Sequence, residues 1–277
     1  MIKINLFAKI NPKILLSLSM LGAISGALAN DTISIGASPI PQSEMLHFAK
    51  PLLAKEGVDL KILEFSDYIT PNLALSQKQL DANFFQHQPY LEQYNKDHKT
   101  QLVSLVKVFI APMGIYANKK TQAKFIASHK VGDIKPGSKI GVPNDPTNEG
   151  RALLILQSNG IIKLKASVAY PTKKDIIANP NQLQLQELDP AMLPRLLSGG
   201  QLDLALINSN YALAAGLHPS KDAVLLESAS SPFANVVAIR SSEINQPRMK
   251  KLAKALTSPA MKNYIQKTFH GDIIPAF

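Results

Sequence analysis

The chain divides into short blocks in which apolar residues recur either at every second position or at helical spacing. Residues 32–36 and 58–63 alternate apolar and polar side chains, which is typical of half-buried strands. Residues 43–55, between them, carry apolar side chains on one helical face and end just before Gly57. The first part of the chain therefore predicts a strand–helix–strand unit.

The same alternation continues to the C-terminus. We expect further strands at residues 82–85, 102–110, 139–142, 183–188, 202–207, 223–227 and 235–239. We expect further helices at residues 70–79, 89–95, 151–159, 192–197, 210–215, 248–256 and 260–268. Strands that alternate with helices predict an α/β fold in which helices cover a mainly parallel sheet. Residues 111–118 are the expected crossing to a second unit, and a cleft between two such units favours a small ligand.

The N-terminal segment has the pattern of a secretory signal peptide. Its basic start, with three lysines, is followed by an apolar run over residues 14–26 and by Ala27-Leu28-Ala29. Small residues in this pattern predict cleavage before Asn30. Residues 1–29 are therefore expected to direct export, and an uncleaved membrane anchor is the alternative.

The net charge and the absence of cysteine exclude several classes of function. The formal net charge is +10, and removing the three signal lysines, with no acidic residue beside them, lowers it to +7. This excess is spread along the chain in isolated lysine pairs, and an exported chain without a basic, aromatic-interleaved motif is not expected to bind nucleic acid. The chain contains no cysteine, which excludes disulfides, thiol catalysis and lipid attachment through an N-terminal cysteine.

A strand–loop–helix corner at residues 143–154 is the strongest candidate site. Thr147 or Asn148 is the expected N-cap, and Arg151 would then lie in the first turn of the helix. Free backbone N–H groups, the helix dipole and a guanidinium together would bind a small carboxylate or phosphate. The alternative is a capped helix whose Arg151 is solvated or pairs with Asp145 or Glu149.

Polar and aromatic residues follow the ends of other predicted strands, where ligands bind in open α/β sheets. The aromatic set is Tyr68, Phe85, His87 and Tyr90, which could hold a flexible thioether side chain. Asn208 and Asn235 offer amides that suit a zwitterion. The alternatives are that Phe85 is core, that His87 caps a helix, and that each Asn forms a turn or a cap.

Signals for an enzyme are weak. The sequence contains no G-x-S-x-G, H-E-x-x-H, Walker or G-x-G-x-x-G motif, and its six histidines show no close spacing for a metal. We therefore expect a binding protein that has no catalytic activity, cofactor or metal.

Several blocks of the chain resemble the methionine-binding lipoprotein family, the substrate-binding proteins of the methionine ABC importer. The blocks are IGASP (35–39), DY (67–68), PNLAL (71–75), LDANFFQH (80–87), PYL (89–91), PMGIY (112–116), PNDPTNEGRALL (143–154), INSNYA (207–212) and SPFAN (231–235). They extend over essentially the whole chain after the signal segment. The resemblance implies a two-lobed periplasmic-binding-protein fold, type II-like, with the ligand cleft between its lobes.

The resemblance also implies roles for particular residues. Arg151 would clamp the carboxylate of methionine, and Asn148 would assist it. Asn208 and Asn235 would bind the amino-acid head group. The residues that would enclose the methionine side chain are Tyr68, Phe85, His87 and Tyr90. Because these residues come from both lobes, ligand binding would stabilise a closed form.

The expected lobes are residues 30–117, completed by 232–277, and residues 118–231, with crossings near 116–119 and 227–232. The expected function is capture of L-methionine and its delivery to a permease driven by a cytoplasmic ATPase. We expect a monomer, because each lobe can bury its own core and the cleft needs no second chain.

The chain departs from the family at its cleavage site. Most members have a lipobox cysteine there, whereas this chain has Ala29-Asn30. A soluble periplasmic protein without a lipid anchor is therefore expected. Two alternatives stay open for the function: a ligand that is D-methionine or a short methionine-containing peptide, and a surface interaction protein or adhesin.

Overall fold

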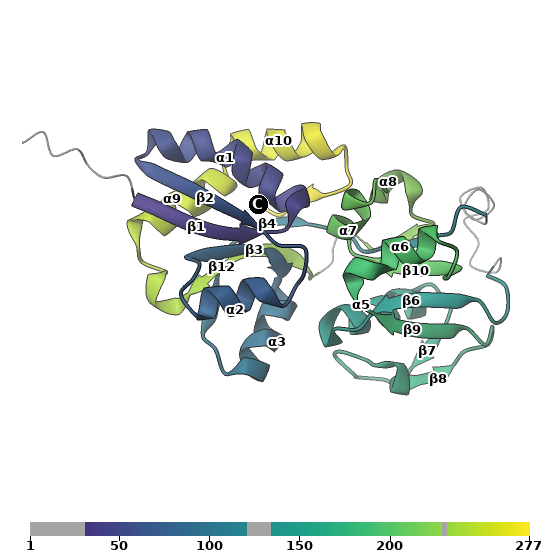
Figure 1. Cartoon of the computed structure of the whole chain (residues 1–277). Coiled ribbons are helices and arrows are strands. Elements are labelled where there is room, and N and C mark those ends of the chain that lie inside the picture. Colours follow the sequence, from purple (N-terminus) through teal and green to yellow (C-terminus); the bar gives the residue numbers. More distant parts are fainter. Residues whose placement is uncertain (1–30, 121–133, 229–231) are drawn as a thin grey trace, which may run out of the picture.

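Two main β-sheets, one in each lobe, organise the computed structural model, which describes residues 31–120, 134–228 and 232–277 (Figure 1). The predicted signal peptide lies outside the described residues. Among the residues described, no helix is both long and apolar enough to cross a lipid bilayer.

The strands and helices follow the predicted order closely. The strands are β1 (Asp31–Ala37), β2 (Val58–Glu64), β3 (Ala82–His87), β4 (Leu102–Ile110), β5 (Gly114–Ala117), β6 (Lys139–Pro143), β7 (Lys163–Leu164), β8 (Ile176–Ala178), β9 (Gln184–Leu188), β10 (Leu204–Ile207), β11 (Leu225–Leu226), β12 (Ala234–Arg240) and β13 (Ile274–Pro275). The α-helices are α1 (Glu44–Lys55), α2 (Thr70–Ser76), α3 (Gln88–His98), α5 (Pro146–Ser158), α6 (Leu193–Ser198), α7 (Ser209–Ala214), α8 (Pro219–Asp222), α9 (Pro247–Leu256) and α10 (Pro259–Phe269). The short helical turns are η1 (Pro39–Ser43), η3 (Lys173–Asp175), η4 (Pro190–Met192) and η5 (Ser241–Glu243). The sequence did not predict β5, the small β7–β8 pair, the short α8 or β13.

The first sheet has the strand order β13-β4-β12-β3-β1-β2. β1 is parallel to β2 and β3, whereas β12 is antiparallel to both β3 and β4. The predicted mainly parallel arrangement is therefore wrong here, because β12 returns from the second lobe and enters the sheet where β3 ends. This insertion places Asn235 directly beside His87 in the strand register.

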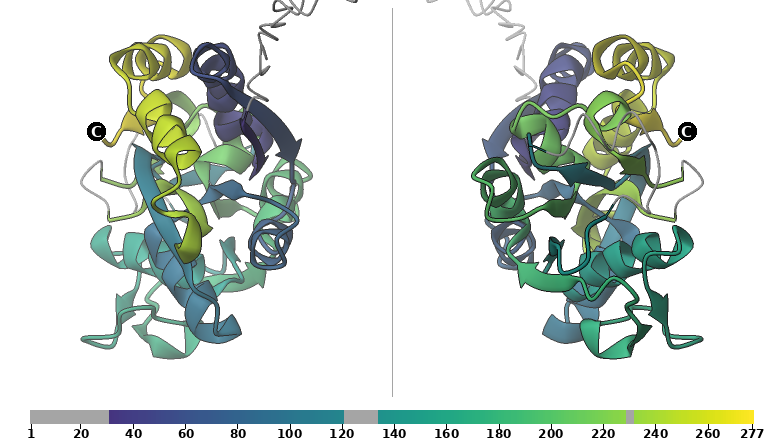
Figure 2. Two further views of the ribbon diagram at one scale, coloured as in Figure 1. Left: turned by 90° about the vertical axis from the view of Figure 1, so that its left-hand side faces the viewer. Right: turned by 90° about the vertical axis from the view of Figure 1, so that its right-hand side faces the viewer.

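Side chains of β12 alternate between two cores, as expected for a strand buried on both faces. Val237 and Ile239 pack with α1, α9 and α10 on one face, and Val236 and Ala238 pack with α2 and α3 on the other. α1 lies beside α9 and α10 in both views of Figure 2. The first lobe is thus a sheet with helices on both faces.

The second sheet has the strand order β11-β5-β10-β6-β9. β10 is parallel to β6 and β6 to β9, whereas β5 is antiparallel to β10 and β11. Leu204 and Leu206 of β10 join the core under α5, and Ala205 and Ile207 join the core under α6 and α7. This lobe is also a mixed sheet between helical layers.

The first crossing between the sheets falls at the start of the expected crossing segment, residues 111–118, and before the lobe boundary expected at residue 117. Residues up to 117 were expected in the first lobe, but β5 is hydrogen-bonded in the second sheet. All four residues of β5 are buried, so this apolar strand needs a strand neighbour on each side. The chain therefore passes from one sheet to the other through Ala111, Pro112 and Met113, and it returns between β11 and β12.

Candidate functional site

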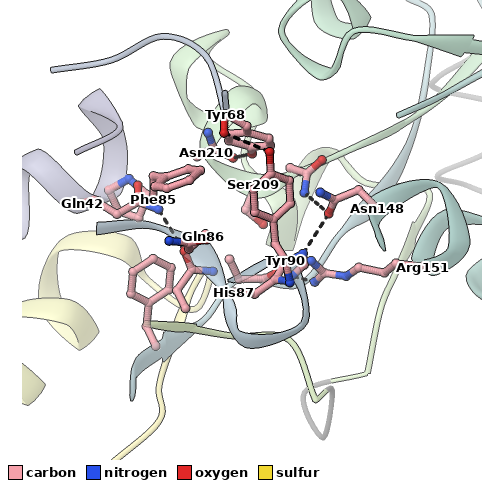
Figure 3. Close-up of a pocket in the computed structure, with 15 residues that line it drawn as sticks. Gln42, Tyr68, Phe85, Gln86, His87, Tyr90, Asn148, Arg151, Ser209 and Asn210 are labelled. Atoms are coloured by element: carbon pink, nitrogen blue, oxygen red, sulfur yellow. Dashed lines mark hydrogen bonds between the residues drawn. The ribbon is translucent and has the colours of Figure 1, made fainter. Parts of the chain in front are cut away.

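A cavity lies between the two lobes and is lined by side chains from both (Figure 3). All eight residues singled out from the sequence line this cavity: Tyr68, Phe85, His87, Tyr90, Asn148, Arg151, Asn208 and Asn235. Lining residues that the sequence did not single out include Gln42, Gln86, Ser209 and Asn210. The fold therefore brings polar and aromatic side chains that are far apart in the sequence to one cavity.

The helix that carries Arg151 begins earlier than the sequence predicted. α5 starts at Pro146, and Asp145 is the N-cap, whose carboxylate accepts the backbone N–H of Asn148 at 3.0 Å. Thr147 and Asn148, the expected caps, lie inside the helix, and Arg151 is in its second turn. Proline suits the first helical position, because it has a suitable φ and no N–H to leave unpaired. The anion site expected at this helix start is therefore filled by the protein's own carboxylate.

Arg151 is paired within the protein although it lines the cavity. Its side chain is 3% exposed, and it donates from Nε to Glu227 and from Nη2 to both Glu227 and the carbonyl oxygen of Ala111. The guanidinium carbon lies 4.4 Å from the ring centre of Phe233. Arg151 is thus paired with a distant acid and not with either nearby acid that local spacing suggested. None of these hydrogen bonds engages Nη1.

His87 is held as a neutral imidazole. Nδ1 accepts the backbone N–H of Tyr90 at 3.1 Å, so Nε2 carries the proton and donates to Oδ1 of Asn148 at 3.1 Å. Burial lowers the pKa of His87 to about 3, and the positive charge of Arg151 contributes to this. The capping interpretation of His87 is confirmed, because Nδ1 caps α3; the ring also lines the cavity.

Two amides present unpaired oxygens at the cavity. Asn208 occupies the N-cap position of α7 but makes no capping bond, and its Nδ2 donates to Asn148 at 2.8 Å. Gln42 donates from Nε2 to Oδ1 of Asn235 at 3.1 Å. Within the described residues, Oδ1 of Asn208 and Oε1 of Gln42 are buried and have no hydrogen-bond partner. A buried carbonyl oxygen without a hydrogen-bond partner destabilises the protein. A ligand with N–H groups would donate the missing hydrogen bonds to these oxygens.

The amide of Gln86 has a different role, although the residue lines the same cavity. It donates to Asn72 and Asn83 at 2.7 and 2.9 Å and accepts from Asn72 at 2.8 Å. These three buried amides satisfy one another, so this network stabilises the wall of the cavity.

Aromatic rings form the remaining wall. The ring centres of Tyr68, Phe85 and Tyr90 lie 5.8 to 6.0 Å apart. The hydroxyl of Tyr68 donates to Asn210 in the other lobe at 2.5 Å, and that of Tyr90 donates to the backbone oxygen of Tyr68 at 2.9 Å. Burial raises the pKa of both tyrosines, so both stay neutral. With its hydroxyls already bonded, this wall offers an apolar surface to a ligand side chain.

Two α/β lobes that enclose a polar and aromatic cavity between them define the class of extracytoplasmic solute-binding proteins. Residues 33–277 match the family model described as NlpA lipoprotein, and the chain belongs to this family. The predicted resemblance to methionine-binding lipoproteins is thereby confirmed.

Similar proteins support both the fold and the family. The chain is 41% identical over 221 residues, 79% of each chain, to the D-methionine-binding lipoprotein MetQ of Salmonella typhi. It is 44% identical to a nutrient binding protein from Burkholderia cenocepacia, whose structure was solved bound to methionine; the match covers 88% of this chain and 100% of that one, with a TM-score of 0.82. An ABC transporter periplasmic substrate-binding protein from Coxiella burnetii is 43% identical over 88% of this chain and 100% of its own, with a TM-score of 0.81. The expected two-lobed fold is confirmed.

Proposed function

We propose that this protein is an extracytoplasmic carrier that encloses one L-methionine between its lobes and delivers it, chemically unchanged, to the permease of an ABC importer. The observation that carries the proposal is a single cavity that combines a buried guanidinium, unpaired amide oxygens and an aromatic wall. The similarity to methionine-binding proteins supports the same ligand.

The head group of the ligand would lie at the polar end of the cavity. Arg151 binds the carboxylate, and Nη1 is the amino group that its bonds to Glu227 and Ala111 do not engage. Asn208 and Asn235 bind the α-amino group, for which an amide oxygen is a suitable acceptor. This assignment keeps each charge of the zwitterion beside a group of opposite polarity.

The side chain of methionine would lie against Tyr68, Phe85 and Tyr90. A thioether is flexible and polarisable, and sulfur contacts aromatic ring edges favourably. Since hydroxyls of this wall are bonded within the protein, the wall does not demand a polar group from the ligand. The site therefore suits an unbranched apolar side chain.

The remaining features belong to the same proposal. The two lobes correspond to the two sheets, with crossings at residues 111–113 and between β11 and β12. The protein acts as a monomer without catalysis, after its signal peptide is removed and without a lipid anchor. Its partners are the permease and the ATPase of a methionine importer.

The test is calorimetry on residues 30–277, unfolded and refolded to remove any co-purified ligand. We expect one-to-one binding of L-methionine, and weaker or no binding of Gly-Met, because the α-nitrogen of its methionine is an amide and not the ammonium that Asn208 and Asn235 would bind. Arg151→Lys keeps a positive charge beside Glu227 but loses the planar fork, so its affinity should fall by about 10- to 100-fold. Arg195→Lys, at an exposed position of α6, is the matched control and should bind as the wild type. Unchanged affinity of Arg151→Lys would contradict the site.

The enantiomer is a second candidate, supported by the names of the curated relatives, which are D-methionine-binding lipoproteins. The same titration with D-methionine distinguishes the two. Tighter binding of D-methionine than of L-methionine would replace the L-methionine assignment.

A further inference from the structure

Asp145 reaches the cavity through one intervening amide. Nδ2 of Asn148 lies 3.0 Å from each of its two carboxylate oxygens. A carboxylate only accepts hydrogen bonds, so it fixes which end of the Asn148 amide faces it. The carbonyl oxygen of Asn148 must therefore point away from Asp145 and toward the cavity.

That oxygen in turn orients two further side chains. Oδ1 of Asn148 accepts from Nε2 of His87 at 3.1 Å and from Nδ2 of Asn208 at 2.8 Å. Since Asn208 directs its NH₂ group to Asn148, it must turn its oxygen the other way. That oxygen is the buried atom without a partner among the described residues, and Asn208 lines the cavity.

We propose that Asp145 is a positioning residue that sets the hydrogen-bond polarity of the site: through Asn148 it holds the oxygen of Asn208 toward the cavity, where it accepts from the α-ammonium group of the ligand. This inference rests on the proposed function and deepens it. If the chain of bonds were reversed, Asn208 would present its NH₂ group and would oppose an ammonium. The site therefore selects free α-amino acids over carboxylic acids that lack this group.

The side-chain bonds of Asp145 go beyond what helix capping requires. Capping needs only one bond to the backbone N–H of Asn148, which Asp145 also makes. Asparagine caps helices about as well as aspartate, but its own amide can donate as well as accept. Asp145→Asn thus keeps the helix cap but replaces the carboxylate, which only accepts hydrogen bonds, by an amide that can face Asn148 with either end.

The experiment compares two ligands that share a carboxylate and a thioether and differ in the ammonium: L-methionine and 4-(methylthio)butanoate. The ratio of their affinities is measured by calorimetry for the wild type, for Asp145→Asn and for Asp189→Asn. Asp189 is a matched control, because it also caps a helical turn of the second lobe, through Ala191, but does not line the cavity.

We expect Asp145→Asn to reduce the preference for L-methionine by at least tenfold and Asp189→Asn to leave it unchanged. In the wild type and in Asp145→Asn, nuclear magnetic resonance should find His87 protonated at Nε2, because Nδ1 still accepts the backbone N–H of Tyr90; this checks that the variant keeps the wall of the site intact. A purely structural role of Asp145 would lower both affinities together and leave their ratio unchanged.

The outcomes separate the two proposals. A wild type that binds L-methionine, with an Asp145→Asn variant of unchanged selectivity, overturns this inference alone. A wild type that does not bind methionine overturns the proposed function and this inference with it. If Asp145→Asn does not fold, Asp145→Ser repeats the test, because serine also caps helices and its hydroxyl can donate as well as accept.

Discussion

The guanidinium of Arg151 is bound by the carboxylate of Glu227, which lies 76 positions further along the chain. Glu227 directly follows β11, where the chain begins its return to the first lobe. Nη2 of Arg151 also donates to Ala111, in the other crossing, at 2.8 Å. One side chain of α5 is therefore fixed to both connections between the lobes.

This pairing predicts the effect of Glu227→Gln. A buried guanidinium that loses its counter-charge is destabilising, so the free energy of unfolding should fall by about 3 kcal/mol without ligand. Saturating L-methionine should recover part of this loss, because the carboxylate of the ligand supplies a new counter-charge. Urea denaturation with and without methionine measures both effects. Glu243→Gln is the control, since Glu243 pairs with Arg240 and Arg248 far from the cavity and should show no such recovery.

His87 should make the stability of the protein depend on pH. Its pKa is about 3 in the folded protein, against an ordinary value of 6.5, so between these values only the unfolded chain takes up the proton. The stability that the neutral, buried His87 contributes is present above pH 6.5 and is lost as the pH falls toward 3, by up to about 1.4 kcal/mol per pH unit.

The variant His87→Asn tests this pH dependence, because asparagine can still cap α3 but does not titrate. Unfolding free energies measured from pH 7 to pH 4 should fall less steeply for the variant than for the wild type. Parallel curves would show that His87 takes up a proton in the folded state as readily as in the unfolded chain.

Tyr68→Phe should weaken ligand binding by weakening closure. The variant keeps the ring but loses the bond from the hydroxyl to Asn210, which joins the two lobes. A bond of this kind contributes about 1 kcal/mol, so methionine affinity should fall by roughly five- to tenfold. Tyr90→Phe is the control, because its lost bond to the backbone of Tyr68 lies within one lobe. An equal loss in both variants would argue against a role in closure.

Asp272 forms a further connection between the lobes and gives a test at lower pH. It accepts from Ser220 at 2.6 Å and contacts Nδ1 of His218 at 2.8 Å, both at the start of α8. Burial alone would raise the pKa of Asp272, but the hydrogen bonds from Ser220 and His218 outweigh it and hold the pKa below the ordinary value of 3.8.

Because the folded pKa of Asp272 is lowered, its contribution to stability is present above about pH 4 and is lost as the pH falls further. Asp272→Asn should therefore cost about 2 kcal/mol at pH 7, and the difference from the wild type should shrink toward pH 3. Denaturation curves at these two pH values measure the change. A constant difference would show that the charge of Asp272 does not contribute.

The sequence predicted most strands and helices but not the order of the strands in the sheets. Alternation located β12, whose side chains serve two cores, but strand order is not a local property and the insertion of β12 between β3 and β4 was missed. His87 and Asn208 were found because His87 lies at the end of β3 and Asn208 directly follows β10, where α/β folds place ligands. Gln42 was missed because it follows two prolines and looks like part of a turn.

The partners of individual side chains in ion pairs and helix caps were the hardest features to predict. Local spacing offered Asp145 and Glu149 as partners for Arg151, whereas the fold supplies Glu227 from a distant crossing. The helix start was misplaced for a related reason: the side chain of Asp145 caps α5, and Thr147 and Asn148 looked equally suitable. Such choices are decided by tertiary contacts that a single sequence does not display.

The insertion of β12 also sets the order in which an exported chain can assemble. β4 has only β12 and β13 as its neighbours in the first sheet, and both come from the last part of the chain. The second sheet needs no strand beyond β11 and can form while that part is still crossing the membrane. The N-terminal lobe is thus the last to be completed. Until then β4 has no partner strand and β3 is the exposed edge of the sheet, so both are open to proteases and to pairing with other chains.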